Sequence, residues 1–122
     1  MRGSMMWEDE ILATYAFASP LLPGKLQTWM HYVQEMKTTH KADLEASRKR
    51  MGMTKEEVWL QQMPTGAFAV VYWEAADIAK VFEQLMTSQE PIDKWFRDRV
   101  LIEVHGMIPS APPPPMNEKV MG

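Results

Sequence analysis

Residues 58–63 and 67–74 are two segments rich in β-branched and aromatic residues, and only three residues separate them. The link of Pro64, Thr65 and Gly66 suits a tight turn, so the segments are expected to pair as an antiparallel hairpin. Side chains alternate between the two faces of a strand. In residues 67–74 both alternating sets are apolar: Phe68, Val70 and Tyr72 on one face, and Ala69, Val71 and Trp73 on the other. Both faces of this hairpin must therefore be covered in the folded protein.

The part of the chain before the hairpin predicts one strand and one helix. Alternating apolar residues predict a strand over residues 11–18. Apolar residues at three- and four-residue steps over residues 26–51 predict one long helix, and Gly52 is a suitable C-terminal stop for it.

The part after the hairpin predicts two more helices. Asp77 is a suitable N-cap for a helix over residues 78–86, which carry apolar side chains at helical spacing. Pro91 favours the first turn of another helix, which would end before Gly106. Residues 100–102 can also be read as a strand, so the sequence leaves two interpretations of this end open.

The two ends of the chain are expected to lie outside the core. Residues 1–6 resemble an expression-tag remnant and a disordered start, and residues 7–106 are expected to form the domain. Five of the nine prolines lie in residues 109–115, where they impose an extended conformation. Residues 107–122 are therefore predicted to be a proline-rich C-terminal arm packed on the body or on a partner, and residues 116–121 could add a final strand.

The order of these elements favours an α+β fold. Strand, helix, strand, strand, helix, helix and an optional last strand follow the ferredoxin-like split βαβ pattern with an antiparallel sheet. The helices of such a fold cover one face of the sheet and leave the second face bare. Since that face is also apolar here, we expect a homodimer in which a second subunit covers it.

Composition excludes several classes of function. The net charge is −3 and the charges are mixed along the chain, which argues against a nucleic-acid partner. There is no cysteine, and the three histidines lack metal-ligand spacing, so neither a metal site nor a cofactor is expected. No apolar run is long enough to span a membrane, and cytoplasmic residence is the expectation.

Several segments carry a resemblance to a known superfamily. They are the hairpin strands 58–61 and 68–74, the segment 88–96, the pair His105 and Gly106, and the proline-rich end. Together they resemble the dimeric α+β barrel superfamily, which includes antibiotic-biosynthesis monooxygenases, muconolactone isomerases, polyketide cyclases and heme-degrading enzymes, and more narrowly an uncharacterised bacterial subgroup. The resemblance implies that two sheets associate across a two-fold axis and that each subunit keeps a pocket between its sheet and its helices.

The candidate catalytic residues are His40, Tyr72 and Glu74. His40 falls on the apolar stripe of the expected long helix, while Tyr72 and Glu74 share one face of a hydrophobic strand. A His and a Glu that meet in a partly dry pocket can act as general acid and base. The alternative is that His40 lies at the edge of the stripe and Glu74 simply ends its strand.

Candidate ligand-binding residues are Tyr15, Trp59 and Gln61, which could provide aromatic walls and an orienting amide, although residues of this kind also serve as plain core. His31 is expected to be solvated, and His105 to stabilise a helix C-terminus as a cationic cap.

Three interpretations of function stay open at this point. The first is a homodimer that binds a hydrophobic small molecule in an apolar pocket, with or without a cofactor-independent oxygenase, cyclase or isomerase activity on an aromatic or polyketide-like substrate. The second is a non-catalytic structural or stress-related dimer whose pocket is filled by its own side chains. The third is a heme-binding protein with His40 as the ligand. A pocket of several hundred Å³ that His40 or Tyr72 reaches would favour the first.

Overall fold

A three-stranded antiparallel sheet organises the computed structural model, which describes residues 12–112 and 115–122. Strand β3 (Gly66–Ala75) lies in the centre, between β1 (Ala13–Pro20) and β2 (Met53–Met63). This order is that of a split βαβ unit with a returning hairpin strand, so the α+β class is confirmed and the topology is compatible with a ferredoxin-like fold.

The expected hairpin is present, and its register sets the two faces of the sheet. Met63 pairs with Gly66, and the ladder continues until Met53 pairs with Ala75. Strand β2 therefore begins five residues earlier than the apolar pattern indicated, because its first half is polar. A register shift between Met53 and Lys55 marks an irregularity in this edge strand.

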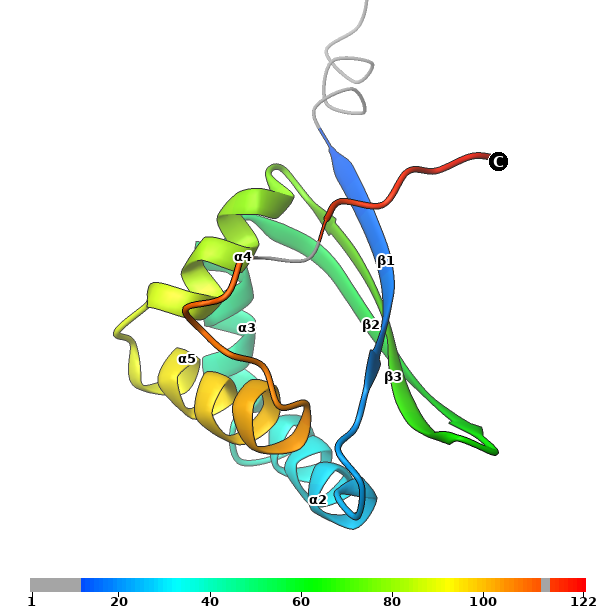
Figure 1. The fold of residues 1–122 in the computed structure, drawn as a ribbon. Coiled ribbons are helices and arrows are strands. Elements are labelled where there is room, and N and C mark those ends of the chain that lie inside the picture. The colour runs from blue at the N-terminus through cyan, green and yellow to red at the C-terminus, as the bar shows by residue number, and fades with distance from the viewer. Residues whose placement is uncertain (1–11, 113–114) are drawn as a thin grey trace, which may run out of the picture.

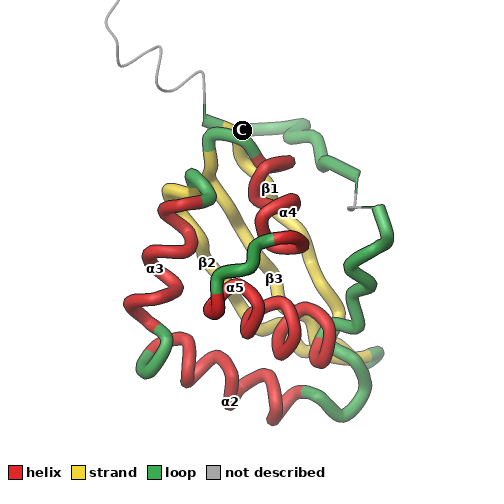
Figure 2. Tube along the Cα trace, turned by 90° about the vertical axis from the view of Figure 1, so that its left-hand side faces the viewer, coloured by secondary structure: helices red, strands yellow, loops and turns green. Residues whose placement is uncertain are grey.

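All the helices of the described part of the chain lie on one face of the sheet (Figures 1 and 2). Helices α2 (Leu26–Lys37) and α3 (Lys41–Arg50) connect β1 to β2. Helix α4 (Ile78–Thr87) follows β3, and α5 (Pro91–Phe96) continues directly into the π-helix η1 (Arg97–Val104). Figure 1 shows that the opposite face of the sheet carries no helix.

The single long helix expected over residues 26–51 is wrong, since the chain breaks it at Thr38 and Thr39. Both threonine hydroxyls donate to carbonyls of the preceding turn, Thr38 to Gln34 at 2.8 Å and Thr39 to Glu35 at 3.4 Å. The amide of His40 also donates to Glu35 O at 2.9 Å, which closes the end of α2. Two consecutive β-branched residues with competing hydroxyls disfavour continuation of the helix.

The helical interpretation of residues 100–102 is confirmed and the strand is wrong, because these residues lie within η1. The N-cap at Asp77 is confirmed as well, since its Oδ1 accepts from the amide of Lys80 at 3.2 Å. A π-helix widens the backbone spiral and often occurs beside a functional site. Here η1 packs toward the sheet through Val100 and Val104, which are both buried.

The C-terminal segment does not add a strand to the sheet. Residues 115–122 cross β1 and then lead away from it without forming a ladder (Figure 1), and the Nδ2 atom of Asn117 donates to Ala16 O in that strand. The predicted start at residues 1–6 lies outside the described residues. Within the described part, no helix is long and apolar enough to cross a bilayer.

Candidate functional site

A cavity of about 980 Å³ lies between the helices and the face of the sheet that they cover. The sheet contributes residues of all three strands, among them Tyr15, Val58 and Trp73. Every helix of the described chain contributes to the opposite wall, including Trp29 of α2 and Phe82 of α4. The volume falls within the range of ligand sites in proteins, so the space is large enough for a drug-sized molecule.

The wall at the centre of the sheet is an aromatic cluster. Tyr15 and Phe17 of β1 lie side by side with ring centroids 4.9 Å apart, and Phe82 meets Tyr15 edge-on at 5.5 Å. Trp73 completes the cluster at 5.1 Å from both Phe17 and Phe82. Mutual packing restrains these rings, so they form a firm apolar surface. Burial also raises the pKa of the Tyr15 hydroxyl, which keeps it protonated at neutral pH.

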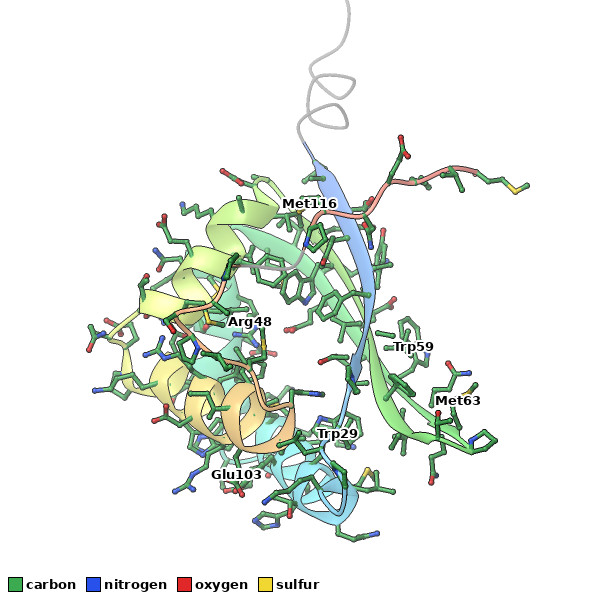
Figure 3. All side chains as sticks on the ribbon, viewed as in Figure 1. Trp29, Arg48, Trp59, Met63, Glu103 and Met116 are labelled. Atoms are coloured by element: carbon green, nitrogen blue, oxygen red, sulfur yellow. The ribbon has the colours of Figure 1, made fainter. Side chains whose placement is uncertain are left out.

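One polar group, built around Arg48 of α3, interrupts the apolar lining. Its Nε donates to Oε1 of Glu56 at 2.9 Å, and its guanidinium carbon lies 4.4 Å from the centre of the Phe96 ring. The other oxygen of Glu56 accepts from Nε1 of Trp73 at 3.3 Å. The Arg48 side chain is only 11% exposed, and Figure 3 shows it between the helices and the sheet. This arrangement holds a guanidinium in a fixed position on the cavity wall.

His105 lines the cavity beside the end of β1. Its Nδ1 lies 2.8 Å from Pro20 O and 3.0 Å from Ser19 Oγ, and a carbonyl only accepts, so Nδ1 carries the proton. Burial lowers the pKa of His105, and the bond to Pro20 opposes this only in part. The ring is therefore neutral at pH 7, and its Nε2 is an unprotonated acceptor. His105 is the C-cap residue of η1, as expected, but its partial burial disfavours the cationic form that was expected there.

The C-terminal segment borders the cavity near β1. Met107 is part of the lining, and Pro115 O accepts from the Tyr15 hydroxyl at 3.4 Å. Figures 1 and 2 show the segment running from the end of η1 to β1. Part of the arm thus contacts the cavity wall, through the hydrogen bond from Tyr15 to Pro115.

The structure does not bring the expected catalytic trio together. His40 is the N-cap residue of α3, and its ring packs against Trp95 in a tilted arrangement with centroids 4.3 Å apart. Tyr72 donates to Oε2 of Glu74 at 2.6 Å, but both residues lie on the sheet face turned away from the helices. The helix break moves His40 off the expected stripe, and strand alternation sends the other two outward. His40 does not line the cavity, so the geometry offers it neither as a general base nor as a heme ligand.

The expected ligand-binding residues are likewise divided. Tyr15 lines the cavity, as described above. Trp59 and Gln61 pair with Val70 and Phe68 and share the bare face of the sheet with them. Figure 3 shows Trp59 projecting away from the helices. Sequence alternation alone does not tell which of the two apolar faces of β3 the helices will cover.

The polar cavity residues Arg48, Glu56 and His105 were not predicted as one site. Arg48 and Glu56 lie eight residues apart on different elements, and both look like ordinary surface charges in the sequence. The available signal was the aromatic neighbour Trp73, whose indole N–H requires an acceptor when it is buried. His105 was singled out in the sequence, but for a different role.

A second polar cluster is centred on Asp93, which is 1% exposed. Its carboxylate accepts from the hydroxyls of Ser47 and Ser88 and from Nη2 of Arg50 at 3.1 Å. Burial alone raises the pKa of Asp93, but these hydrogen bonds outweigh it and the pKa lies below its ordinary value. The cluster ties α3 to α5 and to the loop before α5, away from the cavity. It has the character of a structural anchor.

No group of three or more residues able to hold a metal ion occurs within residues 12–112 and 115–122.

Residues 14–101 match the model of a family of unknown function, DUF6176. The match covers well over half of the chain. The protein belongs to DUF6176. The matched region includes the three strands of the sheet except for Ala13, all helices except the end of η1, and the polar group around Arg48. Neither the curated proteins nor the solved structures contain a match.

Proposed function

We propose that this DUF6176 protein binds a small aromatic molecule in the cavity between its sheet and its helices. The observation that carries the proposal is the cavity of about 980 Å³, whose wall is an aromatic cluster with a few polar groups. Ligand sites combine these two features, since apolar walls supply affinity and a few fixed polar groups supply orientation. An open volume of this size argues against the alternative in which the protein's own side chains fill the pocket.

We also propose that the functional unit is a homodimer joined through the bare face of the sheet. Trp59 is 52% exposed and Met63 47% exposed on the outer edge of that face, beside the partly buried Phe68 and Val70. The neighbouring positions on β1 are the small residues Ala16 and Ala18, which leave room for large side chains of a second copy. A two-fold axis would place the same patch on both sides, as isologous dimers require.

Calorimetric titration with two isosteric probes, neutral 2-naphthamide and anionic 2-naphthoate, tests the binding proposal. At least one should bind with saturation to the full chain. Val58 lines the cavity from the edge strand, so Val58→Phe should fill part of the space and weaken binding by about tenfold or more.

Two control variants lie away from the cavity. Ile102→Phe enlarges an exposed aliphatic residue of η1, and His40→Leu replaces the ring that packs against Trp95. Both should bind as the parent protein does. Absence of saturable binding in the parent, or an equal loss in Val58→Phe and Ile102→Phe, would refute the proposal.

A further inference from the structure

The charges that line the cavity differ in sign from the charge of the whole protein. Five cationic side chains line it, against two carboxylates: Lys37, Lys41, Arg48, Lys49 and Lys55, against Glu45 and Glu56. The chain as a whole carries a net charge of −3. His105, the titratable group near β1, is neutral because burial lowers its pKa. The cavity is therefore a positive region in an acidic protein.

These cations gather along α3, the end of α2 and the edge strand β2. Lys37 ends α2, while Lys41 and Lys49 lie in α3. None of these lysines forms an ion pair with another residue of the described chain, and all are exposed. Cations around an opening with low-dielectric walls attract anions and raise their local concentration.

Arg48 connects this cationic rim to the apolar interior. Its Nε is engaged by Glu56 and its Nη1 donates to Ser47 Oγ at 3.2 Å. Its Nη2 donates to no residue that the structure describes. A guanidinium offers five N–H donors in one plane, so donors are left for a carboxylate that approaches from the cavity.

We propose that the ligand is an aromatic carboxylate, with its ring against Trp73 and Phe82 and its carboxylate between Arg48 and the lysines of the rim. This inference rests on the proposed binding function and adds the charge of the ligand to it. The carboxylate would meet a guanidinium that Glu56 and Ser47 already hold in place, whereas a neutral ligand of the same shape would gain only the apolar contacts.

The experiment compares 2-naphthoate with 2-naphthamide, because the two differ chiefly in charge. The full chain should bind the anion about tenfold more tightly, and added salt should weaken only that binding. The double substitution Lys41→Gln and Lys49→Gln should lower the affinity for 2-naphthoate about fivefold and leave that for 2-naphthamide unchanged.

The matched control is the pair Lys80→Gln and Lys94→Gln, which removes two exposed lysines of α4 and α5 that do not line the cavity. It should leave both affinities unchanged. Equal affinity of the two probes for the parent protein, or equal losses in the two double variants, would overturn the anion preference while the binding function stands. Failure of both probes to bind would overturn the two proposals together.

Discussion

At the scale of single residues, replacement of Asp93 should lower the stability of the fold most. Asp93→Asn removes the charge that accepts from Ser47, Ser88 and Arg50, and an amide cannot accept all three hydrogen bonds. We expect a loss of about 3 kcal/mol in the free energy of unfolding, measured by urea denaturation. Asp98→Asn, at an exposed carboxylate of η1, should change it by less than about 0.5 kcal/mol. Similar effects of the two substitutions would contradict the anchoring role.

The same cluster predicts how stability depends on acid. The pKa of Asp93 lies below its ordinary value of 3.8 in the folded state, so the unfolded chain takes up the proton first. Its contribution to stability is complete above that value and is lost as the pH falls through the lower pKa of the folded state. Urea midpoints measured below about pH 4 should fall less steeply for Asp93→Asn than for the parent protein.

His105 acts in a separate window of pH. The pKa of His105 lies below 6.5 in the folded state. The contribution of its neutral ring to folding stability is therefore fully present above pH 6.5 and is lost as the pH drops below it. Between about pH 7.5 and about pH 5.5 the parent should lose stability that His105→Gln does not lose. A slope unchanged in His105→Gln would show that the ring is not held neutral.

At the scale of elements, the contribution of the C-terminal segment to stability is the hardest to predict from the sequence. Deletion of residues 107–122 removes Met107 from the cavity wall and the contacts of Tyr15 and Ala16 with the arm. We expect a cost of about 1 to 2 kcal/mol, which lowers the melting temperature by roughly 5 to 10 °C. Deletion of residues 118–122 alone, where Val120 and Met121 are largely exposed, should have little effect. Equal melting temperatures for both deletions would identify the arm as a free tail.

At the scale of the whole molecule, the proposed homodimer predicts an oligomeric state that depends on the bare sheet face. The parent protein should scatter light as a dimer of the 14.1 kDa chain at about 10 μM. Val70 lies on that face in the central strand, so Val70→Lys should place two charges in the interface and yield monomers. Ile102→Lys, on the helical side, should remain dimeric. A monomeric parent would contradict the proposed assembly.

The sequence by itself determined the elements whose signals are local. The turn at Pro64, the N-cap at Asp77 and the helix start at Pro91 depend on residues only a few positions away, and all three are confirmed. The helix break at Thr38 was not predicted, because the apolar pattern of residues 26–51 continues across it. The two threonines nevertheless end the helical hydrogen bonding of α2.

Only the tertiary structure decided which residues share a site. Both faces of β3 are apolar, so alternation alone could not tell that Trp73 faces the cavity and Tyr72 faces away from it. Arg48 and Glu56 meet because α3 packs beside β2, and His105 reaches β1 from the end of η1. Such contacts depend on how elements distant in sequence pack together, whereas periodicity reports only the local surroundings of each residue.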